Sequence, residues 1–146
     1  GKAFDAIAFF QVLEHVEDPS IFLDIVRHLL RQTGRIYLSV PNPDRYQLNI
    51  YRESWDYPPH HLSRFTKEGI QRLLSRAGFN ILKIAPRPMD RESRRIVRKS
   101  LYKHLPLPKV LKAIVKLPLR IALYPAGWYY WATSEGQDLY VMAQPK

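Results

Sequence analysis

The 146-residue sequence predicts a domain of the α/β class with a parallel strand–helix–strand unit near its start. Three observations carry this prediction. A short apolar run covers residues 4–10, an amphipathic helical pattern follows residues 18–19, and a second strand-like run covers residues 35–40. Because short connections join a strand, a helix and a strand, the two strands should be parallel neighbours.

Local signals predict each element of this unit. The first run has no polar alternation, which is typical of a buried strand. Asp18 supplies an N-cap, and Pro19 suits the first helical turn. Gly34 lies where a left-handed residue would end the helix, and residues 41–43 would stop the second strand. The spacing of six apolar residues predicts one inward helical face: Ile21, Phe22, Ile25, Val26, Leu29 and Leu30.

The second half of the sequence predicts another helix and two more strands. A polar and aromatic loop over residues 44–65 leads to a helix that Thr66 caps and Gly78 ends. Strands follow at residues 79–84 and 138–143. The residues expected to face inward from this helix are Ile70, Leu73, Leu74 and Ala77.

A lone strand–helix–strand unit leaves sheet faces open, whereas parallel sheets need cover on both sides. We therefore expect missing strands and their covering helices upstream of Gly1.

Composition limits the function classes. A 46% hydrophobic fraction with 12% aromatic residues is enough for a packed core. The sequence has no cysteine, which excludes disulfides and thiol chemistry, and its start has no signal-peptide pattern. The net charge of +10 is uneven, because residues 87–120 alone carry +9. An anionic partner should therefore be sought in that segment.

A long insertion over residues 86–135 separates the last two strands. Its cations recur at helical spacing on one stripe (Lys109, Lys112, Lys116 and Arg120), and an aromatic cluster follows at residues 128–131. Repeated prolines and the lysines argue against a membrane-spanning helix. Two interpretations stay open: a lid on its own domain, and docking of residues 87–131 to an anionic membrane surface. We do not expect nucleic-acid binding, because no recognised module accompanies the charge.

Several motifs together resemble one enzyme family, over residues 4–84 and 136–144. They are Phe4-Asp5-Ala6-Ile7 with Val12-Leu13-Glu14-His15-Val16, Ser39-Val40-Pro41-Asn42, and Trp55-Asp56-Tyr57-Pro58-Pro59-His60-His61-Leu62. This set is similar to class I S-adenosylmethionine-dependent methyltransferases, in the subgroup of ubiquinone-type and envelope-sugar enzymes.

The resemblance implies a partial Rossmann-like methyltransferase sheet. The present strands would be its fourth to seventh, with the last two as an antiparallel hairpin. Residues 1–85 plus 136–146 would form the C-terminal half of the domain, and residues 86–135 a helical basic insertion. The family's glycine-rich cofactor loop is missing, since no G-x-G-x-G occurs. These residues alone should not bind the cofactor tightly.

The resemblance also implies site residues at the strand ends. Phe10, Gln11 and Val12 would contact S-adenosylmethionine; the alternative is a core phenylalanine beside a solvated turn. His15 would act as a base on the acceptor, with Glu14 orienting it. Alternatively, Glu14 caps a turn and His15 packs beneath a loop.

Four further residues would line the acceptor pocket: Asn42, Tyr57, His60 and His61. Asn42 could instead form a turn, and one histidine could seal its loop. Some relatives bind a divalent ion through Glu-x-x-Glu-His. Here Gln11 replaces one carboxylate, and a hard cation prefers carboxylates, so we expect no metal site.

We therefore expect transfer of a methyl group from S-adenosylmethionine to an oxygen of a small-molecule, lipid, quinol or sugar acceptor. The protein would be cytoplasmic or peripheral at the membrane. The alternative is a degenerate, non-catalytic half-domain that docks to a membrane or a partner.

Overall fold

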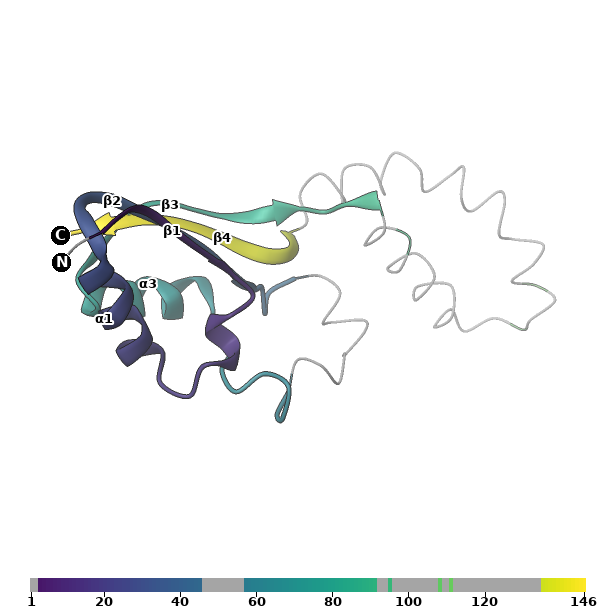
Figure 1. Cartoon of the computed structure of the whole chain (residues 1–146). Coiled ribbons are helices and arrows are strands. Elements are labelled where there is room, and N and C mark those ends of the chain that lie inside the picture. Colours follow the sequence, from purple (N-terminus) through teal and green to yellow (C-terminus); the bar gives the residue numbers. More distant parts are fainter. Residues whose placement is uncertain (1–2, 46–56, 92–94, 96–107, 109–110, 112–134) are drawn as a thin grey trace.

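The computed structural model describes residues 3–45, 57–91, 95, 108, 111 and 135–146 (Figure 1). Most of the predicted insertion over residues 86–135 lies outside this set, as do Trp55 and Asp56, so its two interpretations stay predictions. The elements in chain order are β1 (Phe4–Phe10), the one-turn 3-10 helix η1 (Leu13–His15), α1 (Pro19–Leu29), β2 (Leu30–Pro41), α3 (Lys67–Arg76), β3 (Phe79–Pro88) and β4 (Glu135–Pro145).

One four-stranded sheet has the order β1-β2-β4-β3. β1 and β2 are parallel, with Phe9 opposite Leu38 and Phe10 opposite Ser39. β4 lies between β2 and β3 and is antiparallel to both. The predicted parallel pair and the antiparallel pairing of the last two strands are therefore confirmed.

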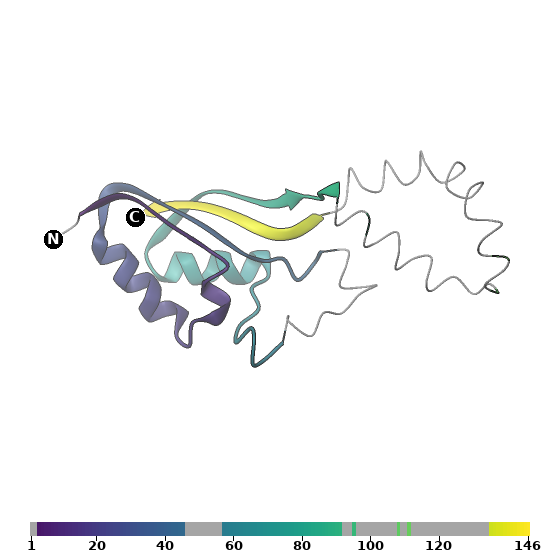
Figure 2. The same ribbon diagram turned by 45° about the vertical axis from the view of Figure 1, so that its right-hand side comes forward.

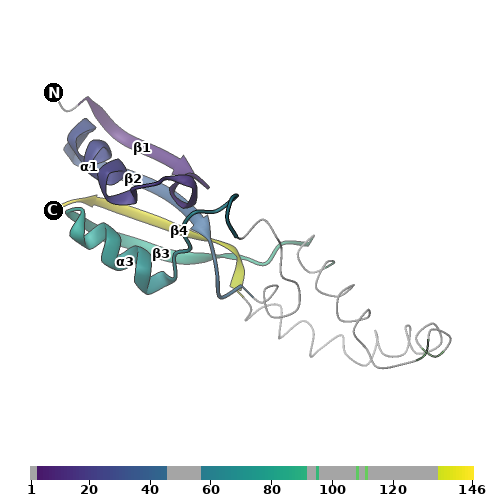
Figure 3. The same ribbon diagram turned by 90° about the horizontal axis from the view of Figure 1, so that it is seen from below.

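Both long helices cover the same face of the sheet, as Figures 1 and 2 show from two sides. Seen from below in Figure 3, α1 crosses in front of β1 and β2, and α3 in front of β3 and β4. The core lies between these layers and includes Leu38, Val40, Leu74 and Val141. In the described part of the chain no helix covers the opposite face.

The start of α1 agrees with its sequence signals. Asp18 Oδ1 accepts hydrogen bonds from the backbone N–H groups of Ser20 at 2.9 Å and Ile21 at 3.1 Å. Thr66 caps α3 in the same way, accepting from the Gly69 N–H at 3.0 Å. These bonds satisfy N–H groups that have no partner inside the helix.

The predicted inward face of α1 is only half right. Leu23, which was not in the predicted set, is buried together with Val26. Ile21, Ile25 and Leu29 are exposed. Because a helix turns about 100° per residue, the six predicted residues span half its circumference. The sheet covers the side of the helix around Leu23 and Val26, which overlaps only one edge of the predicted arc. For α3, burial of Ile70, Leu74 and Ala77 confirms the predicted face, and Leu73 is half-buried.

Gly34 does not end α1, so that prediction was wrong. The helix ends at Leu29, and Leu30 already has extended backbone angles (φ −84°, ψ 138°) and begins β2. Gly34 lies inside β2, where an added Cβ would stand 2.8 Å from Leu30 Cγ. Close packing, not a left-handed turn, explains this glycine. Gly78, which ends α3, does have a positive φ of 80°.

None of the helices in the described part of the chain is long and apolar enough to cross a membrane.

Candidate functional site

The predicted catalytic residues lie where the parallel strands end. β1 runs into Gln11 and Val12, and η1 follows immediately. Two backbone bonds tie a distant loop to η1, since the N–H groups of Leu62 and Ser63 donate to the Glu14 carbonyl oxygen at 2.8 and 3.1 Å. This brings the loop's two histidines next to η1.

Glu14 is completely buried, with 0% of its surface exposed. Neither of its carboxylate oxygens has a hydrogen-bond partner among the described residues. Burial raises the pKa of the Glu14 carboxyl, because loss of hydration disfavours its charged form; the Glu14 backbone and the nearby His15, which favour the charged form, only partly offset this. The site thus contains a carboxyl group held in an unfavourable environment.

His15 is half exposed and is held by its loop neighbours. Its Nδ1 donates to the His60 carbonyl oxygen at 2.6 Å, and its ring stands edge-on to the His61 ring at 4.9 Å. Since a carbonyl only accepts, Nδ1 carries the proton in the neutral ring and Nε2 has the lone pair. Nε2 lies 4.0 Å from Glu14 Oε1, beyond hydrogen-bond distance. The bond that orients His15 therefore comes from the His60 backbone.

Three side chains of this cluster could hold a metal ion. One ligand atom each from Glu14, His15 and His61 lies within 4.8 Å of the others. One carboxylate with two imidazoles suits zinc or iron better than magnesium or calcium. The Gln11 amide nitrogen is hydrogen-bonded to Ser39 and Asp138. The absence of a metal site therefore stays a prediction from the sequence.

Asn42 is buried and connects β2 to β4. Its N–H donates to the Gln137 carbonyl at 2.7 Å, and its Nδ2 donates to the Gly136 carbonyl at 3.2 Å. Its Oδ1 accepts from the Asp44 N–H at 3.0 Å. These bonds correspond to the turn-forming alternative. The predicted role of Asn42 in acceptor binding stays a prediction.

The remaining predicted residues differ in exposure. Phe10 is exposed at the end of β1 and makes an edge contact with Tyr140, at 6.5 Å between ring centroids. Val12 is half-buried against the core. Tyr57 is exposed, and the Arg64 guanidinium stands 5.4 Å from its ring centroid. The peptide bond between Pro58 and Pro59, which follows Tyr57, is cis.

A small pocket, with room for about one water molecule, lies beside His61. Its lining comes from the end of β2 and from the histidine loop: Pro41, Pro43, Arg45, His61, Ser63 and Arg64. It adjoins the His15–His61 contact.

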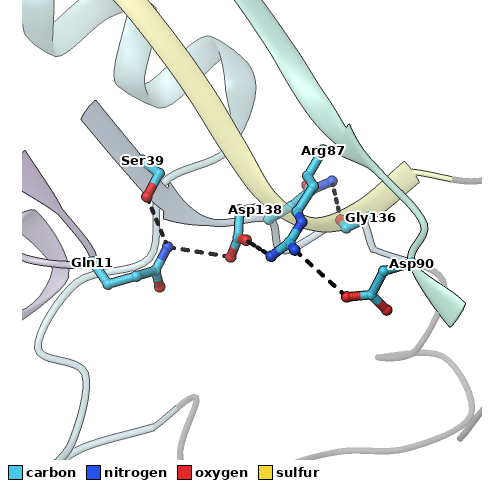
Figure 4. Close-up of polar contacts among 7 residues, drawn as sticks. Gln11, Ser39, Arg87, Asp90, Gly136 and Asp138 are labelled. Atoms are coloured by element: carbon cyan, nitrogen blue, oxygen red, sulfur yellow. Dashed lines mark hydrogen bonds and ion pairs between the residues drawn. The ribbon is translucent and has the colours of Figure 1, made fainter. Parts of the chain in front are cut away.

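The structure adds a polar network that the sequence patterns did not predict. Gln11 Nε2 donates to Ser39 Oγ and to Asp138 Oδ1, each at 3.2 Å (Figure 4). Arg87 donates to the other oxygen of Asp138 at 3.4 Å. Asp138 lies 127 positions from Gln11 in the sequence. Only the pairing register of β4 on β2 reveals the contact.

Solved structures of methyltransferases have folds similar to that of this chain. An S-adenosylmethionine-dependent methyltransferase from Thermotoga maritima superposes with a TM-score of 0.62 at 14% identity, over 99% of this chain and 57% of that one. One from Archaeoglobus fulgidus gives 0.55 at 17% identity, over 98% and 60%. The cyclase SpnF gives 0.54 at 18% identity, over 99% and 50%. At these identities the likeness shows the fold, and SpnF shows that the fold also serves another activity.

Two sequence matches identify the family of this chain. A ubiquinone biosynthesis O-methyltransferase from Xylella fastidiosa strain M23 is 49% identical over 39 residues, which are 27% of this chain and 16% of that enzyme. The chain thus matches only part of its relatives, in sequence and in structure. The sequence profile of a methyltransferase domain matches residues 1–84, more than half of the chain. With the sheet order and the structural matches, this confirms the predicted family: the chain belongs to the methyltransferase domain family.

Proposed function

We propose that the protein containing this chain transfers a methyl group from S-adenosylmethionine to a hydroxyl oxygen of a small-molecule acceptor. A lipid, quinol or sugar precursor would fit the proposal. Its main support is the geometry of His15, whose Nδ1 proton is committed to the His60 carbonyl while Nε2 has its lone pair. The similar stretch in a ubiquinone biosynthesis O-methyltransferase supports the choice of oxygen.

The groups at the strand ends fit such a cofactor. Phe10 offers exposed apolar surface, and the Gln11 side chain offers polar atoms beside it. S-adenosylmethionine would supply an electrophilic methyl group, whose bond to sulfur breaks as the acceptor oxygen attacks. The chain's own part is to hold the acceptor in line and to remove its proton.

His15 is the residue proposed to remove this proton. As the hydroxyl oxygen forms its bond to the methyl carbon, Nε2 takes the hydroxyl proton and the ring becomes an imidazolium. The His60 carbonyl keeps accepting from Nδ1 throughout. The acceptor would approach His15 from the exposed side of its ring.

A His15→Ala variant tests the base. We expect turnover to fall by about 10²- to 10⁴-fold, the usual contribution of a general base, with little change in cofactor affinity. His28→Ala is a matched control. His28 also donates Nδ1 to a backbone carbonyl, that of Asp24 at 2.7 Å, but it lies in the last turn of α1. Normal turnover in His15→Ala would reject the base.

A chelator distinguishes a base from a metal. If His15 acts as the base, EDTA should leave turnover unchanged. If Glu14, His15 and His61 instead held an ion that activates the acceptor, EDTA should abolish turnover and Zn²⁺ or Fe²⁺ should restore it. Failure to bind S-adenosylhomocysteine at all would reject the methyltransferase proposal and favour a non-catalytic module.

A further inference from the structure

Asp138 links parts of the sheet that are far apart in the sequence. It stands opposite Pro41 in the register of β4 on β2, at the carboxyl end of β2. Oδ1 accepts a hydrogen bond from Gln11 Nε2, and Oδ2 accepts one from Arg87 Nη1 (Figure 4). A carboxylate without a proton can only accept. Asp138 therefore holds one donor with each of its oxygens.

This contact decides which end of the Gln11 amide faces outward. The amide nitrogen is the only donor of that group, and it is engaged by both Asp138 and Ser39. Figure 4 shows the amide oxygen turned away from both partners. Gln11 thus presents a hydrogen-bond acceptor, and no donor, to a ligand that lies across the strand ends.

The backbone of Gln11 is also fixed in an uncommon conformation. Its φ is 53°, in the left-handed region that residues other than glycine rarely adopt. Its N–H donates to the Ser39 carbonyl at 3.1 Å. Such conformations persist where the surroundings enforce them, and they cluster at functional sites. An exposed side chain is here held in a single orientation.

We propose that Asp138 is a positioning residue for the side chain of Gln11. By fixing the Gln11 amide, it lets Gln11 Oε1 accept a hydrogen bond from the α-ammonium group of the cofactor. This inference rests on the proposed function. An ammonium has three donors and no acceptor, so it matches the outward oxygen and not an outward amide nitrogen. Position 11 suits an amide because a carboxylate there would face the carboxylate of Asp138. The Arg87 contact at the other oxygen keeps Asp138 in place.

The test is calorimetric binding of S-adenosylhomocysteine, the reaction product, which carries the same α-ammonium and needs no turnover. The comparison uses the protein containing this chain and its Asp138→Asn variant. Asparagine has one side-chain acceptor for two donors, so the Gln11 amide is free to flip. We expect affinity to fall by about 2- to 10-fold, the effect of one net hydrogen bond. The KM for S-adenosylmethionine should rise, and kcat should not change.

Two controls separate positioning from a general structural effect. Asp5→Asn also removes an arginine-paired carboxylate, since Asp5 binds Arg31 at 2.7 Å at the opposite end of β1, and it should leave affinity unchanged. Gln11→Gly relieves the left-handed backbone, which offsets the loss of the two side-chain bonds, so it should still fold and should lose affinity. If Gln11→Gly binds normally, the proposal is wrong.

A double-mutant cycle gives the sharpest result. If Asp138 acts through Gln11, then Asp138→Asn should have no further effect on affinity in a Gln11→Ala background. Equal losses in both backgrounds would overturn the proposal. An analogue of S-adenosylhomocysteine without the amino group should bind wild type more weakly than the parent compound, and Asp138→Asn should discriminate less. If wild type binds neither compound, the proposed function fails. If wild type binds and Asp138→Asn binds equally well, only this inference fails.

Discussion

The buried Glu14 carboxyl predicts a specific dependence of stability on pH. Burial raises its pKa in the folded protein above the unfolded value, which is about 4.3 for glutamate in an open chain. Between these two values the folded state holds a proton that the unfolded state has lost. The stability that this group contributes is therefore complete below pH ~4.3 and is lost as the pH rises through the folded pKa.

The size of the effect follows from proton linkage. A single proton difference changes the free energy of unfolding by about 1.4 kcal/mol per pH unit. Glu14→Gln keeps the shape of the side chain and removes its titration. The variant should therefore gain stability relative to wild type as the pH rises from 4 to 8. Glu17→Gln, at an exposed position three residues along the chain, is the control for replacing a glutamate with a glutamine.

Urea unfolding of the three proteins at several pH values measures these differences. The quantity of interest is the free energy of unfolding of the variant minus that of wild type at each pH, because the contributions of other titrating groups then cancel. A Glu14→Gln difference that is flat with pH would refute the reasoning, and so would a difference that shifts in favour of wild type as the pH rises. Either result would mean that the charged carboxylate has a partner. The series should be run in EDTA, since a metal ion at Glu14 would reverse the sign.

The remaining predictions concern stability and are measured by the same urea unfolding. Asp18→Ala should cost about 1 kcal/mol, because two N–H groups at the start of α1 lose their acceptor; Asp24→Ala on the same helix removes no cap and should cost less. Gly136→Ala should cost about 1–3 kcal/mol or more, because the added Cβ would stand 2.1 Å from the Arg87 carbonyl oxygen. Gly69→Ala meets nothing nearer than 3.3 Å and should stay within about 1 kcal/mol of wild type. Equal losses for the two glycine variants would contradict this account.

Features that depend on neighbouring residues were predictable from the sequence. Asp18 and Thr66 mark helix starts through bonds to N–H groups two or three positions away, and Gly78 marks a helix end through its own backbone angle. The parallel pairing of β1 and β2 follows from the helix that connects them. The strands and the family motifs then agree on one fold.

Features that depend on tertiary placement were harder to predict. Which half of the apolar arc of α1 is buried depends on how the helix lies on the sheet, so Ile21 and Ile25 were misassigned. Gly34 carries the same sequence signal whether it ends a helix or lets a strand pack closely. The pairing of Gln11 with Asp138 depends on the register of a strand that follows a long insertion, and no local pattern encodes that register.

β1 has one further consequence. It forms the outer strand of the described sheet and pairs only with β2 there, so the peptide groups along its other side can accept a further strand. Phe4 and Phe10 expose about half of their surfaces on the face without helices. Such an edge is a template for self-association, and β1 is therefore the element through which this chain, handled alone, would recruit copies of itself.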